Sequence, residues 1–169
     1  MAAEKSAIAV IMGSDSDLPL MQGCIEQLKY FGITPVVRIL SAHRTPVQAA
    51  QFAATAKEAG IKVIIAAAGM AAHLAGAMAA HSPLPIIGVP LQAAESPAGL
   101  DALLSMVQMP PGMPVGTMAV GKTGAKNAAI FAVQILATAD KTLAEKLDKF
   151  RADQTRRTLE KDAELPRPI

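Results

Sequence analysis

One short segment near the N-terminus indicates how this chain folds: Ile8-Ala9-Val10-Ile11-Met12-Gly13-Ser14-Asp15-Ser16-Asp17. Its first five residues are apolar, which is typical of a strand buried on both faces of a parallel sheet. Gly13 ends the strand, and four small polar residues precede a helical pattern that begins at Leu18. Ligands bind at the carboxyl ends of parallel strands, where a helix N-terminus favours anions. The segment therefore predicts a strand and a binding site together. A simpler explanation is that Ser16 or Asp17 caps the helix.

The length predicts a single domain, and the composition predicts that this domain packs through small side chains. The chain has 169 residues, of which 51% are hydrophobic, with four Phe, one Tyr and no Trp. We expect a core over about residues 7–138 and a C-terminal helix and tail over about 139–169. Alanine and glycine fill several segments expected to be buried, and the excess of apolar surface favours a homo-oligomer.

Charge and cysteine content exclude several classes of protein. The net charge is +2, and no basic run with interleaved aromatics indicates a nucleic-acid partner. Cys24 is the only cysteine, so we expect no intrachain disulfide, no thiolate metal cluster and a buried thiol. Neither a signal peptide nor a membrane-spanning run is apparent, and we expect a cytoplasmic protein.

Strand and helix patterns alternate along the chain. Strands are expected at 8–12, 35–40, 63–68, 85–90 and 115–120, and helices at 18–31, 45–60, 71–80, 100–107, 125–137 and 141–161. The alternation predicts a parallel sheet with helices on both faces and right-handed crossovers. We expect the strand order 2-1-3-4-5, which brings together the loops that start at Gly13, Ser41 and Gly69. The last residues, with two prolines, are expected to form a frayed tail.

The loop after the second strand, Ser41-Ala42-His43-Arg44-Thr45-Pro46, places a histidine beside an arginine. A guanidinium at this edge of the sheet suits a phosphate, which it can bind through two parallel hydrogen bonds. Histidine titrates near neutral pH and suits proton transfer. Purely structural roles are the alternative for both residues, and Thr45-Pro46 is a helix start.

The loop after the third strand, from Gly69 to Gly76, consists mainly of small residues. Such a loop lets the backbone approach a ligand closely, and amides at a helix start can bind a carboxylate or a CO2-like group. An alanine-rich packing helix with a capping His73 explains the same residues equally well. Gly121-Lys122-Thr123 lacks the glycine spacing of a phosphate-binding P-loop.

Six motifs occur in an order that resembles a known family: Met12-Gly-Ser-Asp-Ser-Asp17, Ser41-Ala-His-Arg-Thr-Pro46, Ala71-Ala-His-Leu74, Val107-Gln-Met-Pro110, Pro114-Val-Gly-Thr117 and Lys126-Asn-Ala-Ala129. Together they resemble the N5-carboxyaminoimidazole ribonucleotide mutases, also called the catalytic subunit of phosphoribosylaminoimidazole carboxylase. The resemblance extends from Ile8 to about Arg157. It implies a flavodoxin-like three-layer α/β/α sandwich that forms octamers, with active sites at subunit interfaces and no metal or organic cofactor.

The resemblance also implies an isomerase of de novo purine (IMP) biosynthesis. Such an enzyme converts N5-carboxyaminoimidazole ribonucleotide to 4-carboxy-5-aminoimidazole ribonucleotide through bound CO2 and aminoimidazole ribonucleotide. It would act after an ATP-dependent synthetase, a possible functional partner. By the resemblance His43 is the catalytic residue, Ser14 and Arg44 bind the phosphate, and Asp17 binds a ribose hydroxyl. The remaining expected substrate-binding residues are Gly13, Ser41, Gly69, Ala71, His73 and Leu74.

Two residues depart from the loop that the family usually has after its third strand. Met70 replaces a glycine of Gly-Ala-Gly-Gly-Ala-Ala-His-Leu-Pro-Gly, and Ala75 replaces its proline. Carboxylases that use free CO2 usually have lysine after the first histidine, so Arg44 favours the mutases. Direct carboxylation, a non-catalytic nucleotide-binding protein and an FMN electron carrier are the alternatives, and the last is disfavoured by the scarcity of aromatic residues.

Overall fold

The computed structural model describes residues 6–93 and 98–166 and contains a parallel sheet in the order β2-β1-β3-β4-β5. The predicted flavodoxin-like strand order is confirmed. The strands are β1 (Ile8–Met12), β2 (Val36–Ile39), β3 (Val63–Gly69), β4 (Ile86–Leu91) and β5 (Gly116–Thr117). Every residue of β1 and β4 is buried, as their apolar sequences predict for strands covered on both faces.

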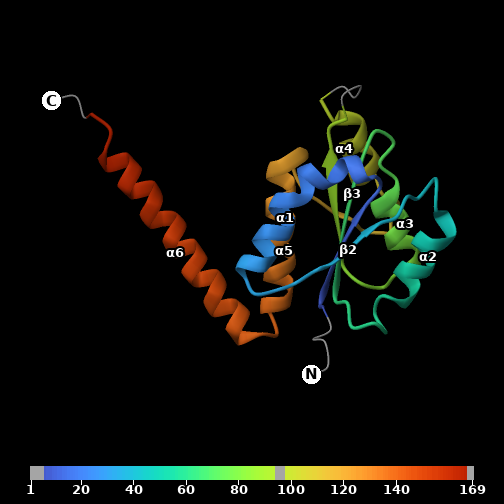
Figure 1. The fold of residues 1–169 in the computed structure, drawn as a ribbon, viewed down its shortest axis with the longest axis horizontal. Coiled ribbons are helices and arrows are strands. Elements are labelled where there is room, and N and C mark those ends of the chain that lie inside the picture. The colour runs from blue at the N-terminus through green and yellow to red at the C-terminus, as the bar shows by residue number, and fades with distance from the viewer. Residues whose placement is uncertain (1–5, 94–97, 167–169) are drawn as a thin grey trace. The chain divides into compact units, whose positions relative to one another are not determined.

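Helices cover both faces of the sheet (Figure 1). After a short 3-10 turn, η1 (Asp15–Asp17), come α1 (Leu18–Tyr30), α2 (Pro46–Thr55), α3 (Leu74–His81), α4 (Leu100–Val107), α5 (Gly121–Ala137) and α6 (Lys141–Ala163). Helix α1 and the first turns of α5 lie on one face, and α2, α3 and α4 lie on the other. None of the helices described here is both long enough and apolar enough to span a membrane.

The chain divides into two compact units at residue 132. The first contains the sheet, α1 to α4 and the start of α5. The second contains the end of α5 and the highly charged helix α6, whose N-cap Asp140 accepts a hydrogen bond from the Leu143 amide. The single-domain organisation stays a prediction.

Several boundaries differ from those predicted. Helix α2 ends at Thr55, and a turn over 56–60 follows, whereas the helix was predicted to continue to residue 60. Helix α3 begins at Leu74, three residues later than expected, because the residues before it form a tight turn. Strand β5 has only two residues, since it lies at the edge and pairs with β4 alone, and α5 starts early, at Gly121. Periodicity places elements better than it places their ends.

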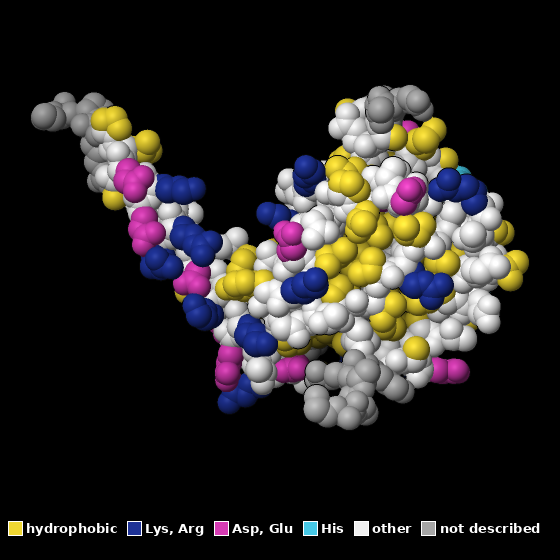
Figure 2. Space-filling view, in the orientation of Figure 1, with side chains coloured by type: hydrophobic (Ala, Val, Ile, Leu, Met, Phe, Trp, Pro, Cys, Tyr) yellow, Lys and Arg dark blue, Asp and Glu magenta, His cyan; other side chains and the backbone are white. Residues whose placement is uncertain are grey.

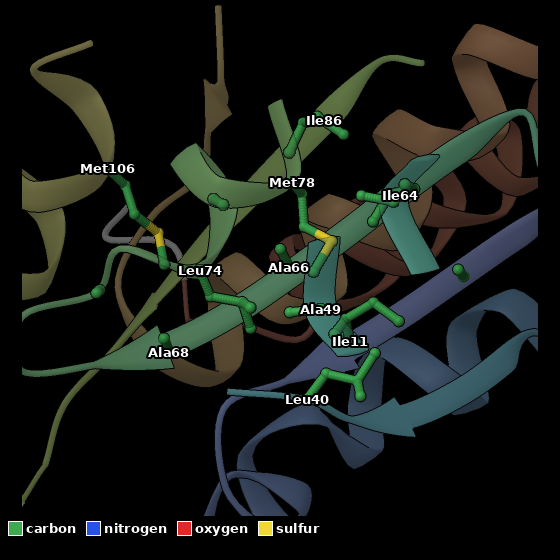
Figure 3. Close-up of a cluster of buried hydrophobic side chains, with 14 of the residues drawn as sticks. Ile11, Leu40, Ala49, Ile64, Ala66, Ala68, Leu74, Met78, Ile86 and Met106 are labelled. Atoms are coloured by element: carbon green, nitrogen blue, oxygen red, sulfur yellow. The ribbon is translucent and has the colours of Figure 1, made fainter. Parts of the chain in front are cut away.

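Small side chains on β3 let the helices approach the sheet closely. Ala66 and Ala68 face α2 and α3, where they pack with Leu74 and Met78 (Figure 3). Met78 and Met106 belong to the same buried cluster, and their unbranched side chains suit the irregular spaces that alanines leave. The core therefore combines close backbone packing with a few flexible large residues.

The register of the sheet brings three loops to one edge. The Leu40 amide donates to the Met12 carbonyl over 2.9 Å, and the Gly13 amide donates to the Ala67 carbonyl over 3.1 Å. The first bond continues the pairing one residue past the end of β2, and the second continues it one residue past the end of β1. The loops after β1, β2 and β3 consequently start side by side, as predicted.

The position of Cys24 generates a first prediction. Its side chain is fully buried in α1, and burial raises the pKa of the thiol to about 12. Only the thiolate is an effective nucleophile, so the native protein should not react with Ellman's reagent at neutral pH. In a denaturant the same sample should release one equivalent of chromophore, because Cys24 is the only cysteine. Rapid labelling without denaturant would contradict the packing of α1 described above.

Candidate active site

A cavity of about 480 Å³ lies at the carboxyl ends of β1, β2 and β3. Every residue that the sequence singled out for a site lies around it: Gly13, Ser14, Asp17, Ser41, His43, Arg44, Gly69, Ala71, His73 and Leu74. The structure thus brings the predicted site residues together, although their roles stay predictions. Leu74 is 2% exposed and also belongs to the hydrophobic core, so it forms part of the cavity's floor.

The loop after β1 is held by hydrogen bonds between its own polar residues. The Ser14 amide donates to Asp17 Oδ2 over 3.0 Å, and the Ser14 hydroxyl accepts from the Ser16 amide over 3.4 Å. These bonds form a capping box at the start of η1, to which Ser14 and Asp17 both contribute side chains. Asp17 is also the N-cap residue of α1, but its side chain makes no capping bond to that helix. The Ser14 hydroxyl also donates to Asp15, which lowers the pKa of that carboxyl. Ser14 would have to exchange these bonds to bind a phosphate.

The loop after β2 is organised around Ser41. Its hydroxyl accepts hydrogen bonds from the amides of His43 and Arg44, over 3.3 and 3.1 Å. Thr45 reinforces the turn, since its hydroxyl accepts from the Ser41 amide over 2.8 Å. Thr45 occupies the predicted N-cap position of α2, but its side chain makes no capping bond because Ser41 occupies it. Ser41 and Thr45 therefore fix the backbone from which His43 and Arg44 project.

Arg44 joins the first two loops. Its Nη2 donates to the Gly13 carbonyl over 2.7 Å, and the side chain remains exposed at the cavity. A guanidinium has five N–H donors, so this bond leaves others for an anionic ligand. Arg44 is thus suited both to closing the edge of the cavity and to binding a phosphate.

The two histidines of the site contact each other across the second and third loops. His43 Nε2 lies 2.9 Å from His73 Nδ1, and the rings meet edge to face with centroids 5.0 Å apart. A hydrogen bond at this distance needs one donor and one lone pair, so the two facing nitrogens share one proton. The contact links the second and third loops at the cavity.

The loop after β3 contains a strained residue at the cavity. Met70 has φ of 56°, in the left-handed region, where a residue with a side chain pays about 1–2 kcal/mol relative to the right-handed conformation. Glycine adopts this conformation readily, and the resemblance described above implies a glycine at this position. Met70 is 53% exposed and lines the cavity.

Residues outside the predicted site also line the cavity: Ser16, Ala42, Ala68, Met70 and Ala93. Ala93 was missed because it follows β4, whose loop has no conspicuous polar motif next to it. Its position, two residues after the last residue of β4, Leu91, could have indicated that it lies at the same edge of the sheet as the site. A ligand site at a sheet edge involves the ends of neighbouring strands whether or not they carry polar residues.

Comparison with known proteins agrees with this geometry. Residues 7–157 match the family of AIR carboxylases. The chain belongs to this family. Over 152 residues it is 50% identical to an N5-carboxyaminoimidazole ribonucleotide mutase of Vibrio vulnificus (strain CMCP6), covering 90% of this chain and 94% of the relative. A mutase of Escherichia coli (strain K12) is 50% identical over 153 residues, and covers 90% of both chains.

A solved structure shares the fold of this AIR carboxylase family member. The crystal structure of Treponema denticola PurE superimposes with a TM-score of 0.84 at 29% identity, covering 95% of this chain and 98% of that one. The sequence resemblance to the family is therefore confirmed. Within residues 6–93 and 98–166, no three His, Cys, Asp or Glu side chains are placed to hold a metal ion.

Asp17 of this AIR carboxylase family member generates a prediction about pH. Burial raises the pKa of its carboxyl above the ordinary 3.8, so the folded state holds the proton more tightly than the unfolded state does. Stability associated with Asp17 is therefore lost as the pH rises through 3.8 and the folded pKa above it. In Asp17→Asn no charge is desolvated, and the amide oxygen can still accept from Ser14.

Thermal unfolding of both proteins between about pH 3 and pH 7 measures this difference. The two Tm values should be similar at the acid end, and Asp17→Asn should become the more stable protein as the pH rises. Asp17→Ala, which removes the capping acceptor, is the control and should be less stable throughout. An Asn variant that is less stable than the wild type at neutral pH would show that the half-buried charge of Asp17 stabilises the loop.

Proposed function

We propose that the protein is an N5-carboxyaminoimidazole ribonucleotide mutase of purine biosynthesis and that the cavity at the ends of β1, β2 and β3 is its active site. The curated relatives carry this name at about half identity over most of the chain. The observation that carries the assignment of the site is the pairing of His43 with His73 in a cavity that Arg44 also lines. The arrangement combines a proton carrier with an anion-binding group.

The phosphate of the nucleotide is assigned to the side of the cavity formed by the first two loops. Arg44 provides the positive charge, and Ser14 lies on the neighbouring loop. Asp17 accepts hydrogen bonds and suits a ribose hydroxyl better than a phosphate. The imidazole then extends toward the third loop, where Gly69 and Ala71 leave the backbone accessible. Arg44 and Ser14 act as the binding groups, and the histidines act on the base.

The reaction moves a carboxylate from the exocyclic nitrogen to C4 of the imidazole. First the N–C bond breaks, the electron pair returns to the nitrogen, and His43 protonates this nitrogen. Aminoimidazole ribonucleotide and CO2 remain bound. C4 then attacks the carbon of CO2, and His43 removes the C4 proton to restore the aromatic ring. The proton that His43 gives in the first half returns in the second, so no oxidant, reductant or external base is consumed.

His73 supports this cycle by pairing with His43. It holds one ring nitrogen of His43 in a fixed direction and shares its proton. Direct carboxylation of aminoimidazole ribonucleotide with free CO2 is the second candidate, because it uses only the later half of the same cycle. An FMN carrier is disfavoured, since the cavity lining in the described residues contains no aromatic ring apart from the two histidines.

The protein is also proposed to act as a homo-oligomer, with the octamer as the expected form. His43, Arg44 and His73 are all exposed in the single chain, so a neighbouring subunit would help to exclude water. Helix α4 exposes Leu100, Leu104 and Val107, which share one face. Apolar side chains are also exposed near the edge strand β2 (Figure 2), where Ile39 is 50% exposed. Such surfaces mark protein contacts more often than they face water.

Further parts of the proposal rest on the enzyme's metabolic role. The reaction needs no metal and no organic cofactor, since each step is a proton or carboxylate transfer. The substrate would come from an ATP-dependent synthetase that carboxylates the exocyclic amine. A cytoplasmic location follows from this pathway.

The role of His43 predicts a loss of turnover without a loss of fold. His43→Asn removes the titrating group, and general acid–base catalysis typically contributes roughly 10²–10⁴-fold. We expect kcat for N5-carboxyaminoimidazole ribonucleotide to fall by at least that order while Tm and nucleotide affinity change little. Circular dichroism, calorimetry of aminoimidazole ribonucleotide binding and steady-state kinetics on one preparation measure all three.

Arg44→Ala is the matched control for binding. It should raise KM far more than it lowers kcat, because a charge-assisted contact with the phosphate is lost. If His43→Asn still turns over at a rate near that of the wild type, the proton-transfer role passes to His73. If it loses stability and activity in proportion, His43 is a structural residue.

The exposed face of α4 predicts that Leu104→Glu disrupts the assembly. Leu104 is 47% exposed, and a charge there should be tolerated by the single chain but not by an apolar interface. Light scattering should show octamers for the wild type and smaller species for the variant. Leu104→Met, which keeps the apolar volume, should assemble normally. A wild-type monomer at micromolar concentration would overturn the proposed oligomer.

A further inference from the structure

Met70 keeps an unfavourable backbone conformation beside the reacting groups. Its φ of 56° lies in the region that favours glycine, and it directly follows Gly69 in the loop after β3. Strained residues persist where the surrounding structure holds them, and they gather at functional sites. Because Met70 lines the cavity, its strained backbone indicates a role of this residue in the cavity.

The neighbours of Met70 show why the loop cannot relax. A Cβ at Gly69 would lie 3.1 Å from the carbonyl oxygen of Leu91, so the loop packs tightly against β4 on that side. On the other side Ala72 is fully buried, and the His73 amide donates to the Ala71 carbonyl over 2.8 Å. The turn is held at both ends, so the backbone of Met70 is held at the edge of the cavity while its side chain stays exposed.

The side chain of Met70 differs from the other apolar residues that line the cavity. The alanines there, at positions 42, 68, 71 and 93, end at Cβ, and Leu74 is 2% exposed. Met70 is 53% exposed and carries a thioether on an unbranched chain. Among the described lining residues it is the one long apolar side chain that can move over the cavity. Methionine adapts to variable shapes at low cost, so it can admit a nucleotide and then close over it.

We propose that Met70 is a cover for the reacting end of the cavity and that it retains CO2 between the two halves of the reaction. This inference rests on the proposed function, in which the N–C bond of the carbamate breaks before the C4–C bond forms. CO2 is neutral and has no permanent dipole, so Arg44 and the backbone amides hold it far less strongly than they hold a carboxylate. Retention then depends on enclosure, which an apolar side chain at the opening provides.

The test measures how much of the original carboxylate reaches the product. The substrate is N5-carboxyaminoimidazole ribonucleotide with ¹³C in its carbamate carbon, and the enzyme is the full-length protein. The solution contains excess unlabelled bicarbonate and carbonic anhydrase, so that any CO2 that escapes mixes with the unlabelled pool. Mass spectrometry of 4-carboxy-5-aminoimidazole ribonucleotide gives the retained label, and a sample without enzyme corrects for spontaneous loss.

Two substitutions separate the side chain from the backbone. Met70→Ala keeps the Cβ and the strained φ but removes the cover. Met70→Leu keeps an apolar side chain of similar volume. The wild type and Met70→Leu should retain most of the label, whereas Met70→Ala should lose severalfold more of it. Met70→Gly should behave like Met70→Ala, and it remains available if Met70→Ala folds poorly, because glycine fits the left-handed conformation.

The outcomes distinguish this inference from the proposed function. Equal retention in the wild type, Met70→Ala and Met70→Gly would overturn the cover, and so would equal loss in Met70→Ala and Met70→Leu. Light scattering on each variant should show the assembly of the wild type, and dissociation would identify Met70 as an interface residue instead. A wild type that makes no product from the labelled substrate would overturn the proposed function. A wild type that makes only unlabelled product from the bicarbonate pool would overturn the cover and favour direct carboxylation.

Discussion

The parallel pairing of β1 between β2 and β3 is the constraint on which the rest of this structure depends. Hydrogen bonds from Leu40 to Met12 and from Gly13 to Ala67 continue the pairing to the very ends of the strands. Because β1, β2 and β3 end in register, the three loops that follow them start next to one another at the same edge of the sheet. A shift by one residue in either pair would move the side chains of a strand to the opposite face of the sheet and displace the loops that carry the histidines. The cavity is a consequence of sheet register.

Within that frame, short polar side chains position the longer ones. Ser41 and Thr45 hold the turn from which His43 and Arg44 project, and Ser14 forms the cap of the first loop. These hydroxyls satisfy backbone groups that would otherwise be left unpaired at the ends of strands and helices. The groups suited to chemistry therefore project from a backbone with few alternative conformations. Such preorganisation is what an active site requires.

Alanine and glycine on β3 have a second consequence besides close packing. They leave little side-chain volume at the start of the third loop, where Met70 is the one long side chain among residues 69–72. Its positive φ is tolerated because Gly69 is pressed against β4 and Ala72 is buried. Tight packing nearby thus maintains a strained residue at the cavity. The same packing explains why α3 begins only at Leu74.

The sequence alone determined the class of fold, the strand order and ten of the fifteen residues around the cavity. Uninterrupted apolar runs such as Ile8–Met12 indicate buried strands. In a parallel sheet the polar residues that follow such strands lie at the same edge of the sheet. Local patterns of this kind depend on neighbours in the chain, which is why they could be predicted. Element ends were less accurate, because the short β5 and the late start of α3 depend on contacts with distant residues.

Only the tertiary structure decided how the site residues interact. Three features have this origin. His43 contacts His73, and Arg44 donates to the Gly13 carbonyl, so each of these contacts joins two loops. The third is the left-handed conformation of Met70. The first two join loops that lie far apart in the chain and depend on the register of the strands, whereas the glycine that Met70 replaces was the only sequence signal for the third. The sequence thus identified the participants, and long-range packing set their geometry.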